Sequence, residues 1–338
     1  MQLLQFIFGI AVLIFVHELG HFIAARLLKV EVEEFGFGFP PRITKLFDLK
    51  GTAITLNWIP LGGFVRPKGE NDPTIEGGLA AASPWVRLGV LFAGPVMNLL
   101  TGIILGILLF YTLGDRVLEK VLVQSTVPGS PAAEAGLQPG DLFISANGQA
   151  IDSVQKLQTI VADSVGKTVS FVVQRGGQNL TIQVVPRTNP PEGQGPLGVG
   201  LDNPTRPVSL LTASYRGVYA AYENVNAIVL LPVRMIRGQV TPQEGRLVGY
   251  KGMYDIYQRI QSPLFFFMMI SISLGIMNLL PIPALDGGRI IMTLPEILFR
   301  RRVPMKYENA INMIGFALLL GLLFYINIQD FVNPIQLP

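Results

Sequence analysis

The stretch QLLQFIFGIAVLIFVHELGHFIAA, residues 2–25, decides the fold class of this chain. It is long enough to cross a bilayer as one helix, because about 20 apolar residues span the hydrocarbon core. Only His17, Glu18 and His21 place ionisable groups in its interior. No basic residues precede the run, and it is longer than the apolar part of a signal peptide. We therefore expect a transmembrane helix here and no cleaved leader.

The composition of the whole chain also indicates a membrane protein. Half of the 338 residues are apolar and 14% are charged, unlike the usage of ordinary soluble domains. Further apolar runs lie at about residues 86–113, 263–282 and 309–328, so we expect four transmembrane helices. The chain has no cysteine, which excludes thiol catalysis and leaves His and carboxylates as the strong metal ligands.

The positions of the basic residues predict an orientation. The net charge is +3, but no basic stripe is interleaved with aromatic residues, so we expect no nucleic-acid partner. Short loops rich in Lys and Arg are cytoplasmic by the positive-inside rule. This rule predicts a cytoplasmic loop after the first run and another between the third and fourth runs, with residues 114–262 on the outer side. The basic residues concerned are Arg26, Lys29, Arg289, Arg300, Arg301, Arg302 and Lys306.

Two regions outside the apolar runs have the composition of folded structure. Residues 30–66 contain β-forming stretches and Gly-rich turns, which predict a small membrane-associated sheet. Residues 117–201 have short β-like runs around a helical stretch at about 153–163, which predicts a compact α+β module. We expect four regions in all: an N-terminal membrane region (1–116), the module (117–201), a helical region (202–262) and a C-terminal membrane region (263–338).

The segment 218–236 has two interpretations. It is apolar enough for a fifth transmembrane helix, but it contains Glu223, Asn224, Pro232 and Arg234. We favour an amphipathic helix at the membrane interface. A fifth span would also break the even number of spans that the basic loops support.

The pattern His17-Glu18-Leu19-Gly20-His21 predicts a zinc site. On a helix, residues four apart lie on one face about 5–6 Å apart, so both imidazoles can reach one ion. Glu18 is suited to take a proton from a water molecule at that ion, as a general base. These are the only two histidines in the chain, and ionisable groups inside a membrane helix are costly unless they are used.

A catalytic zinc usually has three protein ligands, and Asp286 is the candidate for the third. It lies in Pro281-Ile282-Pro283-Ala284-Leu285-Asp286-Gly287-Gly288, directly after the third apolar run. The prolines end the helix and the glycines permit a sharp turn, which allows the carboxylate to face inward. The alternative is a solvent-facing aspartate at the end of a helix.

With these motifs, the chain closely resembles the site-2 protease family of intramembrane zinc metalloproteases. The resemblance also rests on Ala93-Gly94-Pro95-Val96-Met97-Asn98 and Leu285-Asp286-Gly287, and it covers nearly the whole chain. Within this family, the chain resembles the bacterial branch that is similar to the regulator of sigma-E protease and carries an extracytoplasmic PDZ domain. Residues 127–144 look like the start of such a domain, and residues 196–201 are a hypothesis for its permuted strand. The chain has room for one such module.

The resemblance implies an activity and a set of roles. Zinc would be held by His17, His21 and Asp286, and Glu18 would activate water. Asn98 and Asn278 would hold the substrate backbone or the oxyanion. The substrates would be membrane proteins cut within a transmembrane segment, such as an anti-sigma factor or a remnant signal peptide. The unwound substrate would pair with the edge of a sheet formed by residues 36–43 and 52–58.

The resemblance also implies a location: a multi-pass protein of the bacterial inner membrane, with its active site toward the cytoplasm. The PDZ domain could bind a peptide or only exclude large substrates, and both readings stay open. Two other functions compete. One is a membrane-anchored PDZ receptor with a vestigial metal centre, and the other is a metal transporter.

Overall fold

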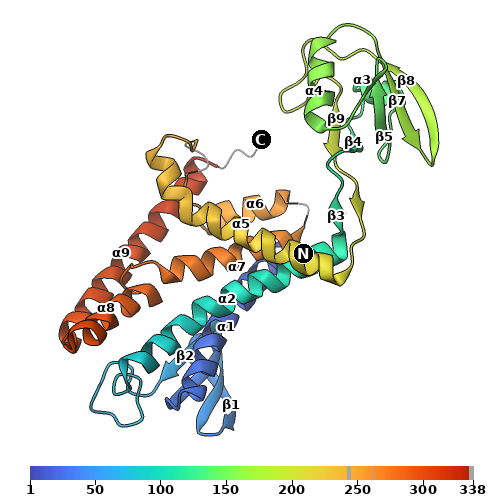
Figure 1. The fold of residues 1–338 in the computed structure, drawn as a ribbon. Helices are drawn as coiled ribbons and strands as arrows, with labels where there is room; N and C mark the ends of the chain where they lie inside the picture. The colour runs from blue at the N-terminus through green and yellow to red at the C-terminus, as the bar shows by residue number, and fades with distance from the viewer. Residues whose placement is uncertain (242–244, 261, 335–338) are drawn as a thin grey trace. The chain divides into compact units, whose positions relative to one another are not determined.

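The computed structural model describes residues 1–241, 245–260 and 262–334 (Figure 1). The chain forms two compact units, one built from residues 1–109 and 210–338 and the other from residues 110–209. Residues 242–244 and 261, which belong to the predicted region 202–262, lie outside the described residues.

Three helices of the first unit are long and apolar enough to cross a membrane. They are α1 (Gln2–Leu27), α2 (Pro84–Leu113) and α9 (Met305–Val332). The predicted third span is a shorter apolar helix, α7 (Pro263–Leu279), of 17 residues. It ends before residue 282 because Pro281 and Pro283 cannot continue a helix. The described residues therefore contain three candidate spans instead of the predicted four.

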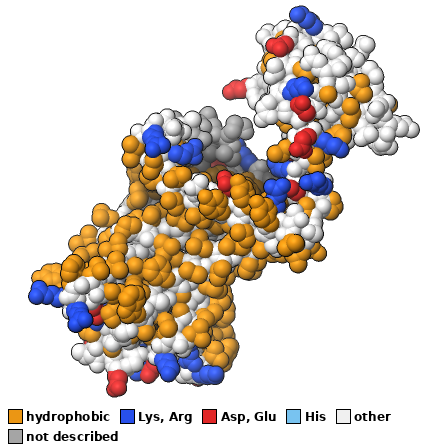
Figure 2. Space-filling view, in the orientation of Figure 1, with side chains coloured by type: hydrophobic (Ala, Val, Ile, Leu, Met, Phe, Trp, Pro, Cys, Tyr) orange, Lys and Arg blue, Asp and Glu red, His pale blue; other side chains and the backbone are white. Residues whose placement is uncertain are grey.

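Three more helices belong to this unit: α5 (Leu210–Ile236), α6 (Tyr250–Arg259) and α8 (Asp286–Phe299). The helix α5 has the length of a span, yet it is not among the described helices apolar enough to cross. The sequence predicted only a basic loop where α8 begins. The helix α8 has 14 residues with Pro295 inside it, and it is too short to show as an apolar run. Side chains exposed on α5, α7 and α9 are largely hydrophobic (Figure 2).

Glycines bring the helices of this unit into close contact. A Cβ atom added at Gly20 of α1 would lie 2.4 Å from the carbonyl oxygen of Ala93 on α2. One added at Gly217 of α5 would lie 2.5 Å from the backbone nitrogen of Ile107. Such backbone contact is typical of helix packing in membranes, where small residues let helices approach. The Gly20 contact fixes α1 against α2 at the level of the two histidines.

The small sheet predicted between the first two spans is present as β1 (Val32–Leu49) and β2 (Thr52–Pro67). Both strands bend back on themselves, so residues 34–37 pair with 53–56 on one side and with 63–66 on the other. Residues 44–49 complete the sheet by pairing with 52–56. The segments 36–43 and 52–58 that the sequence predicted for the edge are thus partly interior. In the described part of the chain, 63–67 has a partner on one side only.

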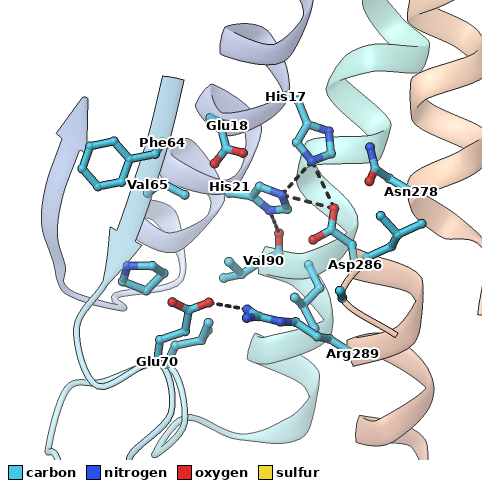
Figure 3. A pocket seen from close by; sticks show the side chains of 15 residues that line it. His17, Glu18, His21, Phe64, Val65, Glu70, Val90, Asn278, Asp286 and Arg289 are labelled. Atoms are coloured by element: carbon cyan, nitrogen blue, oxygen red, sulfur yellow. Dashed lines mark hydrogen bonds and ion pairs between the residues drawn. The ribbon is translucent and has the colours of Figure 1, made fainter. Parts of the chain in front are cut away.

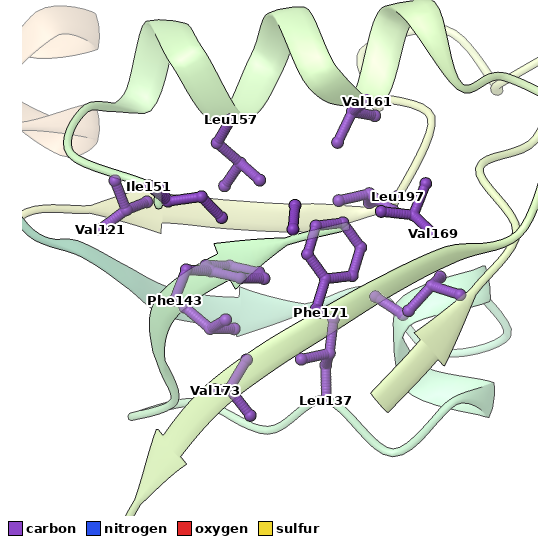
Figure 4. Packing of buried hydrophobic residues seen from close by; sticks show 14 residues of the cluster. Val121, Leu137, Phe143, Ile151, Leu157, Val161, Val169, Phe171, Val173 and Leu197 are labelled. Atoms are coloured by element: carbon purple, nitrogen blue, oxygen red, sulfur yellow. The ribbon is translucent and has the colours of Figure 1, made fainter. Parts of the chain in front are cut away.

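The second unit is a sheet covered by a helix. Its strand order is β8-β7-β5-β4-β9, with β6 (Gln149–Ala150) paired to β5. Leu157 and Val161 of α4 (Val154–Asp163) point onto Phe143 and Phe171 of the sheet, and this contact closes the core (Figure 4). The other elements are β4 (Val121–Thr126), α3 (Pro131–Glu134), β5 (Leu142–Ala146), β7 (Val169–Arg175), β8 (Gln178–Val184) and β9 (Val199–Asp202).

The sequence located most of this unit. The predicted helix at 153–163 is α4, and two of the β-like runs expected around it are β7 and β8. The strand suspected at 196–201 is β9, which pairs antiparallel with β4. The unit is wider than 117–201, since β3 (Asp115–Arg116) pairs with β10 (Thr205–Arg206). Two-residue strands carry no periodicity, so this stem could not be read from the sequence.

Candidate metal centre

Three side chains from two distant parts of the chain meet in the helical unit. His17 and His21 lie one turn apart on α1, as their spacing predicted, and Asp286 is the first residue of α8. Figure 3 shows both imidazoles and the Asp286 carboxylate pointing toward one another. One ligand atom from each lies within 4.8 Å of the others, so the three residues could hold a metal ion.

The distances within this group match those of a tetrahedral zinc site. His17 Nε2 lies 3.1 Å and His21 Nε2 lies 3.3 Å from Asp286 Oδ2. The two Nε2 atoms are 3.2 Å apart. Ligands at about 2.0–2.1 Å from a tetrahedral zinc are separated from each other by roughly 3.3 Å. The three atoms therefore have the spacing of three corners of the tetrahedron.

Hydrogen bonding leaves these atoms free to bind a cation. His21 Nδ1 lies 2.8 Å from the carbonyl oxygen of Val90, so this nitrogen must carry the proton and donate it. In the neutral imidazole, the Nε2 lone pair then faces the centre. Asp286 Oδ2 is buried and has no hydrogen-bond donor. Lone pairs that converge in this way repel each other unless a positive charge lies between them, and a zinc ion fits that need.

Gly94 of α2 provides the space for the two imidazoles. A Cβ atom at this position would lie 2.3 Å from His21 Nε2 and 2.8 Å from His17 Cε1. Any other residue would occupy the volume in which the ligand atoms meet. Gly94 precedes Pro95 within α2. The steric function of this Gly-Pro pair is to leave space for the two imidazoles.

The two glycines after Asp286 permit close packing and not a positive φ angle. A Cβ atom at Gly287 would lie 2.1 Å from the carbonyl oxygen of Leu280, and one at Gly288 would lie 2.3 Å from that of Ile282. The first turn of α8 is thus pressed against the end of α7. The positive φ angle in this turn belongs to Ala284, at +72°. The predicted tight turn is present, but the residue with the left-handed backbone is Ala284 and not one of the two glycines.

A cavity of about 300 Å³ opens onto this centre. Glu18 lines it on the side of the sheet, and its carboxylate faces the backbone N–H of Val65. Glu70 and Arg289 form an ion pair at the opposite end of the cavity (Figure 3). The remaining lining residues are His17, His21, Phe64, Pro67, Leu79, Val90, Leu91, Asn278, Ala284, Leu285 and Asp286. The Glu18 carboxylate therefore lies beside the three candidate ligands and is not one of them.

Comparison with known proteins assigns the chain to a family. Residues 5–322 match the family model described as Peptidase family M50. The chain belongs to peptidase family M50. It is a zinc metalloprotease embedded in a membrane by apolar helices.

Relatives of this M50 protease match it along nearly its whole length. A protein of Clostridium perfringens, named as a candidate zinc metalloprotease, is 33% identical over 99% of this chain and 100% of its own. One of Campylobacter jejuni with the same description is 34% identical over 97% of this chain and 93% of its own. A third, from Nostoc, is 32% identical over 98% and 96%.

Two solved structures are similar to a quarter of this M50 protease. One is the PDZ domain of an SdrC-like protein of Listeria monocytogenes, with 27% identity, a TM-score of 0.22 and 87% of that chain covered. The other is a solution structure of a Geobacillus thermodenitrificans protein, with 25% identity, a TM-score of 0.20 and 92% of that chain covered.

The two asparagines predicted to bind substrate lie in different places in the M50 protease. Asn278 lines the cavity, and its Nδ2 donates to the carbonyl oxygen of Leu274 one turn earlier. Asn98 is 1% exposed and does not line the cavity. Its amide lies behind His17, with Nδ2 3.3 Å from His17 Nδ1. Asn98 therefore presents no surface to this cavity, and its expected contact with substrate stays a prediction.

Sequence reasoning missed several residues at this site. Val90 and Gly94 carry no chemical signal of their own, since one acts through its carbonyl and the other through the lack of a side chain. Glu70 and Arg289 are 219 positions apart, and a single sequence does not reveal such a pair. Arg289 was read only as part of a basic loop.

Proposed function

We propose that this M50 protease cuts peptide bonds within transmembrane segments of other membrane proteins, with His17, His21 and Asp286 as zinc ligands and Glu18 as the general base. The observation that carries the proposal is the convergence of these ligand atoms in a cavity among membrane-length helices, with Glu18 on its wall. A soluble substrate would not require a site built inside apolar helices. A substrate within the bilayer would.

When bound, zinc would polarise the scissile carbonyl and lower the pKa of water. The residues of this chain supply the proton transfer, the oxyanion contact and the orientation of the ligands. Glu18 accepts a proton from the attacking water and returns it to the leaving nitrogen. Asn278 turns its amide from Leu274 toward the substrate and donates to the oxygen that gains charge. The Asn98 amide orients His17 from behind, because its unpaired Oδ1 can accept the Nδ1 proton once the amide is rotated.

The substrate must be extended to reach this site, because helical hydrogen bonds hide its peptide bonds. The edge formed by residues 63–67 suits such a strand better than the segments expected from the sequence. Phe64, Val65 and Pro67 from this edge line the cavity beside Glu18. A substrate strand paired with it would recover backbone hydrogen bonds lost by unwinding.

The membrane arrangement is part of the proposal. We count α7 as a fourth span beside α1, α2 and α9, because the 17 residues of this apolar helix reach the lower limit for crossing a bilayer, and four spans leave both termini on one side. The basic loops then face the cytoplasm of a bacterial inner membrane. The site faces the cytoplasmic side, and the module of residues 110–209 lies on the outer side. The region 202–262 is peripheral, with α5 at the interface as an amphipathic helix rather than a fifth span.

The outer module is assigned as a PDZ domain that selects substrates already trimmed on the outer side. A groove of about 180 Å³ lies between α4 and β9, lined by Leu157, Val161, Leu197 and Val199 among others. It could hold an extended apolar peptide, such as a new C-terminus. Single-span proteins such as anti-sigma factors or remnant signal peptides fit this selection. Replacing residues 117–204 by a short linker at the β3–β10 stem should let untrimmed substrate be cut, and an unchanged need for trimming would refute the filter.

The central test compares Glu18→Gln with the wild-type protein in detergent. We expect cleavage of a transmembrane model substrate to fall by about 10³-fold, within the range for loss of a general base, while one zinc per chain is retained. Retained cleavage would exclude Glu18 as the base. Absence of cleavage by the wild-type protein together with zinc binding would favour a PDZ receptor, and zinc flux into proteoliposomes without cleavage would favour a transporter.

A further inference from the structure

Asn312 places a polar amide in the apolar helix α9, away from the cavity wall. Its Oδ1 accepts a hydrogen bond from the backbone N–H of Ala284, with 3.1 Å between the two atoms. Three residues later, Gly315 is buried against Pro283, where an added Cβ atom would lie 2.4 Å from the Pro283 Cβ. The helix α9 therefore contacts the same turn with two successive residues of one face.

This turn adopts a conformation that its own sequence does not favour. Leu285 N–H donates to the carbonyl oxygen of Ile282 over 3.2 Å, which closes a four-residue turn with Pro283 second and Ala284 third. Ala284 has a φ angle of +72°. The third position of a turn with positive φ is usually glycine, because a Cβ atom disfavours left-handed backbone. Such a conformation persists when surrounding contacts hold it, and Asn312 and Gly315 supply those contacts.

The turn determines where Asp286 points. Asp286 follows it directly as the first residue of α8, and Leu285 at the helix start makes no side-chain capping bond. The backbone of residues 282–285 is therefore the local support of the carboxylate. At the other end of α9, the buried carboxylate of Asp330 accepts hydrogen bonds from Arg246 and from the backbone N–H of Gly249, so α9 is tied to the rest of the unit there as well as at the turn.

We propose that Asn312 is a positioning residue of the metal centre: from α9 it fixes the turn 282–285 and thereby holds Asp286 at the ligand-atom spacing seen with His17 and His21. The proposal rests on the assignment of Asp286 as a zinc ligand. It assigns α9 a role in metal binding besides that of a membrane anchor.

The alternative is that Asn312 only links α9 to its neighbouring segment, as amides in membrane helices often do. The two roles differ in what rescues the loss of the amide. If Asn312 compensates for left-handed backbone at Ala284, then glycine at position 284 removes the need for it. If Asn312 has only a linking role, glycine at position 284 does not change the effect of removing the Asn312 amide.

The test uses full-length protein in detergent, with zinc affinity measured by competition against a chelator. We expect Asn312→Ala to weaken zinc binding about tenfold, at the low end of the effect of groups that support ligands. The visible absorption of the cobalt-substituted protein should change as well, because the ligand geometry relaxes. Asn309→Ala is the matched control, since Asn309 is an exposed amide one turn earlier on α9, and it should leave both readouts unchanged.

The second part is the cycle with Ala284→Gly. The double variant should regain at least half of the lost zinc affinity on a logarithmic scale, and Ala284→Gly alone should bind zinc as the wild type does. Should Asn312→Ala fail to accumulate, Gly315→Ala perturbs the same contact by overlap with Pro283 and should also weaken zinc and alter the cobalt spectrum.

Two results would overturn the proposal. One is wild-type zinc affinity and cobalt spectrum in Asn312→Ala, or in Gly315→Ala if that variant is used. The other is a loss that Ala284→Gly does not reduce. Asp286→Ala separates these failures from failure of the ligand assignment. If that variant keeps zinc, the proposed function itself is wrong, whereas loss of zinc in Asp286→Ala but not in Asn312→Ala rejects only the role of Asn312.

Discussion

Two shielded aspartates, one in each unit, have opposite surroundings. Asp141 in the second unit has no exposed surface, and its carboxylate accepts hydrogen bonds from Arg175 Nε at 2.6 Å, Arg175 Nη2 at 2.7 Å and the backbone N–H of Gln138 at 2.9 Å. Asp286 in the helical unit has one buried oxygen that faces two imidazole nitrogens and no donor.

The contrast separates a structural carboxylate from a proposed metal ligand. A buried charge must be paired or bound to a cation, since burial without compensation is costly. Asp141 is fully compensated by its own unit. Asp286 Oδ2 has no such donor, and a zinc ion at the centre of the three ligand atoms would supply the positive charge that its carboxylate lacks. The hydrogen-bond inventory around each carboxylate thus predicts which of the two binds metal.

The largest expected difference concerns zinc itself. Asp286→Ala should lose bound zinc after dialysis against a mild chelator, and cleavage should fall by at least about 10³-fold, because a two-histidine site lacks the third ligand of catalytic zinc centres. Asp141→Ala should keep one zinc per chain. Elemental analysis of both variants decides this, and equal zinc contents would remove the contrast.

A smaller loss is expected when the space for the imidazoles is reduced. Gly94→Ala places a Cβ atom 2.3 Å from His21 Nε2, so the two ligands must shift, and we expect zinc affinity to fall about 100-fold. The control is Gly89→Ala on the same helix, where the new Cβ meets only the flexible end of Leu28 at 2.8 Å. Chelator competition measures both. Comparable affinities for the two variants would show that Gly94 does not shape the site.

In the second unit the expected effect is on stability. Asp141→Ala leaves Arg175 and the Gln138 N–H without their partner, and we expect the unfolding free energy of this unit to fall by about 2 kcal/mol, as for other hydrogen bonds to charged groups. Urea unfolding of the full-length protein, followed by a probe in residues 110–209, measures it. A change below about 0.5 kcal/mol would mean that solvent replaces the pair at no cost.

The smallest effect is a dependence on pH. Burial alone would raise the pKa of Asp141, but hydrogen bonds from Arg175 and Gln138 and the charge of Arg175 lower it below its usual value. The stabilisation is therefore complete above the unfolded pKa of about 3.9 and is lost as the pH falls through the lower folded pKa. The stability difference between the wild type and Asp141→Asn should shrink below about pH 4. A constant difference from pH 6 to pH 3 would contradict this assignment.

The sequence predicted the half of the site that depends on local geometry. His17 and His21 come together because a helix places residues four apart on one face, and no tertiary contact is needed for that inference. Asp286 was found because prolines and glycines mark a turn after an apolar run. The groups around these side chains were not found, because they act across long sequence separations. Val90 accepts from His21 through its carbonyl, and Asn312 and Gly315 contact the turn before Asp286 through a hydrogen bond and close packing.

The fold shows the same limit. Apolar runs and turn residues located α1, α2, α9, the small sheet and most of the second unit. The path of the sheet was not predictable, because residues 34–37 and 53–56 each pair on two sides within one short segment. Asn98 was assigned to substrate from its motif, whereas its burial depends on how α2 packs against α1 and α7.

The most direct test of the metal assignment is an anomalous-scattering map at the zinc edge from crystals of the full-length protein. We predict one peak about 2.0–2.2 Å from His17 Nε2, His21 Nε2 and a carboxylate oxygen of Asp286. A peak bound to the two histidines with Asp286 turned away, or no peak among these three side chains in zinc-replete protein, would contradict the account.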